Sequence, residues 1–458
     1  MKRLIGNFAT ILMITGAAHF AFAPAALATE PVSSFEPGPV EKLVSDTLVG
    51  ISENEPQASI GFVIGQICPS GTVINDADFQ ARCNEVAGAA LSDNNTANGA
   101  LQAMAPEEDA VIASSQVDSG SAQIDNIGDR LSSLRGGGGG GLVFRNSSGF
   151  NWSTGAAGDG MSSPWGFFVN GLYVTSDRDS TSRESGFTSD DFGVTAGIDY
   201  TFSDRFVLGF AFGYKDSDAD IDANGGDLES DSYSYFAYWS LYPNENWYID
   251  AMAGYTENDH DQTRNVIYTI GGPGTGLGAG SNTISNAALS STESEEFSVS
   301  VTAGRNYFLD AWTLSPYGRI DYADIEIDGF NERMAQTTAL GSGLALQIDD
   351  QDFDSLMMTL GASATTQWGE RYFPQVSVEY VHEFKNNNDP ITGRFLADTS
   401  GTTFALLTDR PDRNFFNVGA AMTAVLTDSM TGFFRYQGLF GYEDLEVHAF
   451  EVGVRVGF

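Results

Sequence analysis

The chain has 458 residues, and its 22 Lys and Arg against 61 Asp and Glu give a formal net charge of −39. Such an acidic chain repels phosphate backbones, which excludes nucleic acid as a partner. The high Gly and Phe content, with only 18% charged residues, is typical neither of a soluble cytosolic domain nor of a disordered acidic chain. No apolar stretch after the N-terminus is long enough for a membrane-spanning helix, so any passage through a membrane must use β-strands.

Residues 1–28 have the pattern of a secretory signal peptide. Lys2 and Arg3 form a basic start, Leu4–Phe22 is mainly apolar, and Ala26-Leu27-Ala28 supplies small residues for cleavage. A membrane anchor is the alternative, but no charged stop-transfer pattern follows Ala28. The sequence therefore predicts export, and the mature chain is expected to start at Thr29.

Residues 29–105 are expected to be a short, mainly helical or irregular region that resembles a passenger. Export leads to an oxidising compartment, so Cys68 and Cys83 are predicted to form a disulfide, which contributes about 3 kcal/mol by loop closure. A two-cysteine metal site is disfavoured, because no histidine lies between Thr29 and His260 to complete it.

Residues 106–141 are predicted to form a linker helix and a Gly-rich hinge. Pro106 suits the first position of a helix, and Glu107–Asp109 suit the positive end of its dipole. The helix would end at the run Gly136–Gly141. Apolar residues recur on one helical face farther along. The predicted pore helix comprises Ile124, Ile127, Arg130, Leu131 and Leu134.

Residues 150–458 are predicted to form a β-barrel, because strand-like runs recur there with connections of two lengths. Short turns are expected at 203–204, 243–245, 309–310, 369–370 and 427–429. Longer loops are expected at 176–186, 217–227, 258–291, 328–352, 385–411 and near Gly441. Five turns and six loops make eleven connections, which predicts twelve antiparallel strands.

Each strand alternates between large apolar residues and small or polar residues. Apolar side chains outside and polar side chains inside are the reverse of a soluble sandwich, which remains the disfavoured alternative; the pattern favours an outer-membrane barrel. The lumen-facing set is predicted to include Asp199, Asp250, Arg319, Glu379 and Arg455, as solvated or mutually paired lining without a catalytic role. A lumen of this size could hold one helix, so residues 106–141 are expected to act as a plug or tether.

Two other kinds of site were considered. Asp220, Asp222, Asn224 and Asp231 have the spacing of a calcium loop, but no helices flank them and a solvated acidic loop is the favoured interpretation; no metal or cofactor is predicted. The mature histidines are His260, His382 and His448, and none stands in a hydrolase motif. The chain is therefore not expected to be an enzyme.

Three motifs together make the chain similar to the translocator domains of type V autotransporters. They are Asp129–Gly136, the strand Val378–Phe384, and the ending from Tyr436–Gly441 to Phe458. The resemblance spans about Ser121–Phe458. Two departures are the short upstream region and the lack of the Asn-Asn pair that some members use for self-cleavage.

The resemblance implies a monomeric barrel among the outer-membrane lipids of a Gram-negative bacterium, with the linker helix in its pore. Phe458 would be the signal for the barrel assembly machinery. Periplasmic chaperones would be further partners during assembly. Long loops would face outward, and the N-terminal segment would be exported or tethered at the cell surface. The alternatives are a plugged narrow pore or structural outer-membrane protein, and an adhesin that acts through its loops.

Overall fold

The computed structural model describes residues 37–69, 71–112, 127–128, 131, 143–145, 151–153, 164–203, 205–222, 226–244, 246–271, 281–385, 390–427 and 429–457. The predicted signal peptide lies outside these residues. So do Ile124, Arg130, Leu134, Asn224 and Phe458 from the predicted sites.

The N-terminal part of the described chain is helical, with α1 (Pro39–Ile51), α2 (Glu55–Ile67), α3 (Ala77–Ala89) and α4 (Asn94–Met104). Side chains of Asn54, Asp76 and Asp93 cap the later three helices by accepting backbone N–H bonds. The predicted disulfide is present, and it joins buried Cys68 after α2 to Cys83 in α3, with 5.4 Å between the Cα atoms. Among the residues described, no helix has the length and apolarity to cross a membrane.

The rest of the chain forms a closed antiparallel barrel, and the described strands of its ring number twelve, as predicted. The strands are β3 (Trp165–Arg178), β4 (Phe187–Ser203), β5 (Phe206–Ile221), β6 (Asp227–Leu241), β7 (Trp247–Gly271), β8 (Ser281–Arg305), β10 (Trp312–Ile327), β14 (Gln351–Thr366), β15 (Tyr372–Glu383), β18 (Asn414–Thr427), β19 (Met430–Phe440) and β20 (Leu445–Gly457). The last strand, β20, pairs with the first, β3, which closes the ring without a free edge.

Several short strands lie outside the twelve-stranded ring. They are the hairpin β1 (Val143–Arg145) and β2 (Asn151–Ser153), β9 (Tyr307–Leu309) beside β10, and β12 (Arg333–Met334) beside β8. Two long connections of the barrel supply a separate sheet of β11 (Phe330–Asn331), β13 (Leu346–Ile348), β16 (Ile391–Phe395) and β17 (Phe404–Leu406).

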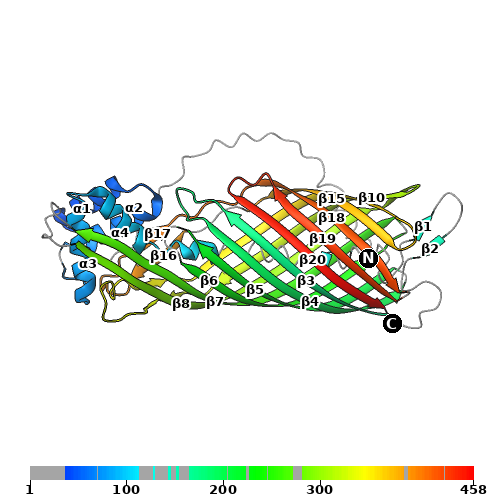
Figure 1. Ribbon diagram of the computed structural model, residues 1–458, viewed down its shortest axis with the longest axis horizontal. Helices are drawn as coiled ribbons and strands as arrows, with labels where there is room; N and C mark the ends of the chain where they lie inside the picture. Colours follow the sequence, from blue (N-terminus) through cyan, green and yellow to red (C-terminus); the bar gives the residue numbers. More distant parts are fainter. Residues whose placement is uncertain are drawn as a thin grey trace, which may run out of the picture. The chain divides into compact units, whose positions relative to one another are not determined.

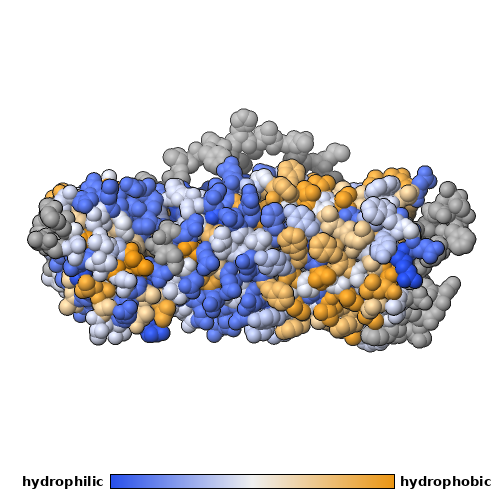
Figure 2. Space-filling view, viewed as in Figure 1, coloured by the Kyte–Doolittle hydropathy of each residue, from blue (hydrophilic) through white to orange (hydrophobic). Residues whose placement is uncertain are grey.

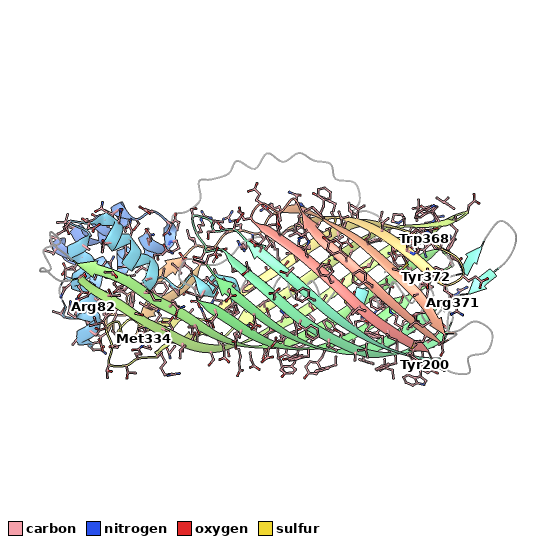
Figure 3. The ribbon with its side chains drawn as sticks, in the orientation of Figure 1. Arg82, Tyr200, Met334, Trp368, Arg371 and Tyr372 are labelled. Carbon is pink, nitrogen blue, oxygen red and sulfur yellow. A yellow bond between two sulfur atoms is a disulfide. The ribbon has the colours of Figure 1, made fainter. Side chains whose placement is uncertain are left out.

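The two ends of the barrel differ. Tight turns gather at one end, where Tyr200, Trp368 and Tyr372 lie (Figure 3). The opposite end carries the long connections and the helices, and the ribbons of β7 and β8 reach toward it farther than those of β3 and β20 (Figure 1). Arg82 and Met334 lie at this helical end (Figure 3).

The outer face of β7 shows where the membrane-facing part of the barrel ends. Its outward residues are apolar from Trp247 to Tyr255, and the next three outward positions are Glu257, Asp259 and Asp261. A transmembrane strand needs about 9–11 residues, whereas β7 and β8 have 25 each. More than half of this hairpin therefore lies beyond the apolar band, which appears in Figure 2 as orange residues beside a blue zone.

Two of the predicted loops are wrong for this reason. Most of 258–291 belongs to β7 and β8, and 217–227 includes the last five residues of β5 and the first residue of β6. Their Asp, Ser and Asn content lowers intrinsic strand propensity, but continuous pairing from Asp227↔Thr263 to Gly271↔Ser281 decides the structure. Outward polar residues such as Asp259 face solvent on a strand, whereas inward ones such as Asn258 and Gln262 are buried.

Inside the ring, aromatic side chains lie across glycines that are their direct partners in register. A Cβ atom added at each of these glycines would stand 2.2–2.4 Å from an atom of the aromatic side chain. The described pairs are Phe168–Gly197, Tyr238–Gly209, Phe236–Gly254, Tyr248–Gly304, Tyr317–Gly361 and Phe433–Gly453. The rings thus fill the lumen wall where glycine leaves room.

We expect Gly209→Ala to destabilise the barrel by roughly 1–3 kcal/mol, because the new Cβ would overlap the Tyr238 ring and displace its hydroxyl, which donates to Asp199 at 3.2 Å. The temperature at which the folded barrel loses its fast electrophoretic mobility measures this. Gly171→Ala is the matched control, since nothing lies within 3.9 Å of its Cβ position. Equal transition temperatures for the two variants would contradict the packing argument.

Candidate functional site

The lumen holds part of the linker that precedes the barrel. Ile127 and Leu131 are helical and fully buried, and they stand one helical turn apart. They form one apolar cluster with lumen-facing residues of four strands, namely Phe168, Val207, Ala211, Phe236, Tyr238 and Met252. The apolar spacing of the linker therefore matches a contact with the wall formed by β3, β5, β6 and β7.

The predicted lumen-facing charges are largely buried in the described ring, and each has a partner. Asp199 accepts from Tyr238, and Asp250 accepts from Ser240 at 2.5 Å. Glu379 accepts from Tyr317 at 2.5 Å, Arg319 pairs with Asp321 at 2.8 Å, and the Arg455 guanidinium lies 3.9 Å from the centre of the Phe433 ring. Each of these charges is thus held by a neighbouring side chain of the barrel wall.

The lumen also contains a cavity of about 140 Å³, lined by residues of β3, β4, β10, β14, β15, β18, β19 and β20. Its lining is mixed, with Leu172, Met357, Val381, Phe415 and Leu439 beside Arg319, Arg435 and Glu451.

The helices share a hydrophobic core with the parts of the barrel that extend beyond the apolar band. We call this the shared core. Its helical members include Ile60, Ile64, Phe79 and Leu101; its β7–β8 members include Val266, Tyr268, Ile270 and Ile284; its members from the long connections include Phe330, Leu344, Leu346, Phe395 and Phe404. The helices and the extended strands therefore fold as one unit.

Polar contacts join the same partners. The Ser59 hydroxyl in α2 donates to the Ala405 carbonyl in β17 at 2.8 Å, and the Asn282 amide in β8 donates to Glu85 in α3 at 2.6 Å. A backbone bridge joins Ile74 to Asp398. Directional bonds of this kind fix the orientation of the helices on the sheet, which apolar burial alone does not.

Sequence reasoning missed the shared core. A signal was present, because Val266, Tyr268 and Ile270 recur at every second position, as do Leu344, Leu346 and Ile348. The Asp, Ser, Asn and Gly content of the surrounding segments nevertheless favours loops.

Three consecutive carboxylates, Glu107–Asp109, are buried between the helices and the mouth of the barrel. Residues 108–112 are helical, so the predicted helix start after Pro106 is correct, but the carboxylates do not face solvent. Burial raises the pKa of Glu108 to about 8 and that of Asp109 to about 7, and it also raises the pKa of Glu107. Two apolar residues that follow, Val111 and Ile112, pack against the wall around Ile221 and Ile325.

The neighbouring charges are paired with each other. Arg264 in β7 makes a bidentate ion pair with Glu332 at 2.6 and 2.7 Å, and it also donates to the carbonyls of Ala103 and Leu344. Arg178 pairs with Glu184 at 2.7 Å. Arg264 thus links α4, β7 and the long connection before β14 at one buried point.

Beyond the apolar band, the outer face of the strands is densely acidic. The register places Asp216, Asp231, Asp259 and Glu293 side by side across four strands. Like charges opposite each other destabilise a sheet, so this face depends on water and salt for screening.

The calcium-loop candidate does not fall in one loop. Asp220 ends β5 and pairs with Asp227, whereas Asp231 lies farther along β6 opposite Asp216. Asp222 follows β5, and Asn224 is outside the described residues. The described part of the chain contains no group of three or more His, Cys, Asp or Glu side chains that could hold a metal ion.

Comparison with known families decides what kind of barrel this is. The model of the autotransporter beta-domain matches residues 167–437, which is more than half of the chain. The chain belongs to the autotransporter β-domain family. Autotransporter translocator barrels reside in the outer membrane of Gram-negative bacteria, so the barrel is an outer-membrane translocator, and neither a soluble sandwich nor an unrelated pore is favoured.

Individual relatives are more distant. An uncharacterized protein of the trpE-trpG intergenic region of Pseudomonas putida is 27% identical over 44% of this chain and 31% of its own length. Esterase EstA of Pseudomonas aeruginosa is 25% identical over 49% of this chain and 32% of its own length. This autotransporter barrel therefore spans about a third of each of these relatives.

A solved structure has the same fold. The translocator domain of the autotransporter NalP from Neisseria meningitidis aligns with a TM-score of 0.52 at 14% identity, covering 74% of this chain and 98% of that domain.

Phe395→Ala tests the shared core. The Phe395 ring lies 4.8 Å from that of Phe79 in α3 and is fully buried, so its removal is expected to cost about 3–5 kcal/mol of helix docking. Limited proteolysis should then release the helices from a barrel whose thermal transition is unchanged. Leu396→Ala is the control, because Leu396 is 40% exposed; equal protection in both variants would refute the contact.

Proposed function

We propose that this autotransporter carries residues 29–105 across the outer membrane and keeps them docked at the cell surface. The observation that carries the proposal is the shared core, in which all four described helices α1–α4 or their flanks pack with β7, β8 and the long connections. Burial on this scale favours retention of the segment over release as a free passenger.

The orientation of the barrel in the membrane follows from the difference between its two ends. Barrels of this class have short periplasmic turns and longer extracellular loops. The helices pack on the long connections, so they belong on the extracellular side. Assembly from the periplasm would use chaperones, the barrel assembly machinery and the terminal Phe458, and the lone closed ring supports a monomer in outer-membrane lipids.

The surface that an extracellular ligand would meet is then formed by the helices and the long connections together. Because the long connections contribute Phe330, Leu346 and Phe404 to the same core as the helices, they do not act as independent adhesive loops. A ligand outside the cell would meet helices and loops together, which supports display of a compact unit rather than a loop-only adhesin.

Catalysis is not part of the proposal. His260 stands between Ser230 and Ser294, with its ring nitrogens 2.7 and 3.0 Å from their hydroxyls, but it is only 3% exposed. The His448 ring bonds the Tyr436 hydroxyl at 2.9 Å, and His382 bonds Asn414. These arrangements satisfy the imidazoles without presenting a nucleophile to a substrate.

Protease-cleavable tags test on which side of the outer membrane the helices lie. A protease-cleavable tag inserted beside Leu91, which is 81% exposed between α3 and α4, should be cut on intact cells. The same tag at Gly369, in a tight turn of the opposite end where nothing crowds a Cβ, should be cut only after lysis. Protection at Leu91 on intact cells, with cleavage after lysis, would place the helices in the periplasm and overturn the proposal.

A further inference from the structure

The segment Glu107–Asp109 is the first part of the chain after the docked helices, and it is buried where the chain enters the barrel. Glu107 accepts from Gln102 in α4 and from Ser185 in the β3–β4 connection. Asp109 accepts from Gln262 in β7 at 3.1 Å. The triplet therefore touches the helices and two different parts of the barrel wall.

Glu108 is the most deeply buried residue of the triplet. Its side chain is completely buried, and neither carboxylate oxygen has a hydrogen-bond partner among the other residues that the structure describes. A Cβ atom at Gly226, in the β5–β6 turn, would stand 3.1 Å from its Oε1, so the carboxyl lies directly against the backbone of that turn. An ionised carboxylate without donors in such a place costs several kcal/mol.

The surrounding charges do not supply the missing partner. Arg264 faces the triplet from β7, but Glu332 holds it in a bidentate pair. From the β3–β4 connection comes Glu184, which pairs with Arg178 and receives the backbone N–H of Asp409. These two ion pairs are neutral, and Asp409 is itself 4.0 Å from Arg183, so the described neighbours balance one another and leave the three carboxylates with an excess of negative charge.

We propose that Glu107–Asp109 form a proton-dependent latch that holds the N-terminal helices on the barrel. When the carboxyls carry protons, the segment stays packed in the mouth and the helices stay docked. When they ionise, the segment leaves the mouth, and the helices lose one of their links to the wall, so that docking through the shared core is weakened. The inference rests on the proposed function in one respect: with the helices at the cell surface, the latch responds to the proton concentration outside the cell.

The direction of the pH dependence follows from burial. The pKa of Glu108 is raised from 4.5 to about 8 in the docked state, so the docked state binds more protons than the released state between these values. Docking is therefore strongest below the lower pKa and weakens as pH rises through the upper one, by up to about tenfold per pH unit for each carboxyl. Asp109, with its pKa raised to about 7, adds to the same trend.

The test uses the purified full-length protein in detergent, which has no inside or outside. Limited proteolysis at pH 6 and pH 9 is followed by the mass of the released helical fragment, and each rate is divided by the cleavage rate of an unfolded substrate at the same pH. We expect release at least tenfold faster at pH 9 in the unmodified protein. Glu108→Gln should show a pH effect whose logarithm is about two-thirds smaller, because the amide is neutral throughout and only Glu107 and Asp109 still ionise.

Glu53→Gln is the matched control, since Glu53 is exposed between α1 and α2, and it should behave like the unmodified protein. If Glu108→Gln does not fold, Asp109→Asn replaces it and should lower the logarithm of the pH effect by about a third. A pH-independent release of the unmodified protein, or an undiminished pH effect in the variants, would overturn the latch. Neither result depends on surface display, which the tag experiment on intact cells tests separately.

Discussion

The pairing of β7 with β8 over 25 residues each is the constraint on which the rest of the structure depends. A bilayer requires about 9–11 residues of each strand, so the hairpin continues far beyond the apolar band. Its inner face is polar at first, from Asn258 to Arg264, and becomes apolar toward the end of β7, with Val266, Tyr268 and Ile270 in line. Without a cover these residues would be exposed to water, and the helices supply that cover.

The same constraint explains why so acidic a chain folds into one compact assembly. Carboxylates on the outer face of the extension meet water, where screening limits their repulsion. At the mouth, buried carboxylates lie near Arg264, which is fixed between Glu332 and two backbone carbonyls. The charged pairs at the mouth fix the positions of the segments that they join, while the apolar residues around them supply most of the free energy of burial.

Much of the fold is predictable from the sequence because a barrel repeats one simple rule. Alternation along strands such as Phe192–Phe202 and tight turns such as Ser203–Asp204 give the strand number and the two faces. The disulfide follows from two cysteines in an exported chain. The spacing of Ile127 and Leu131 predicts a shared helical face, and both residues are buried in the lumen cluster.

The shared core and the buried triplet were not predictable in the same way. Asp, Ser and Asn favour loops locally, so the strand extensions become visible only when the partner strand is known, as in Glu257↔Glu295. Likewise, Glu107–Asp109 fit an ordinary solvated helix start, and only the three-dimensional packing around Arg264 reveals their burial. The spacing of Val266, Tyr268 and Ile270 indicates a strand, but it does not identify the helices that cover that strand.

The central claim is that the helices dock on the barrel's own extended strands. A photo-crosslinking amino acid at position 85 in α3, within the intact chain in outer membranes, tests it most directly, because Glu85 contacts Asn282 at the start of β8. The account predicts a crosslinked peptide from the first residues of β8. Crosslinks only to other proteins, or none in a correctly folded barrel, would contradict it.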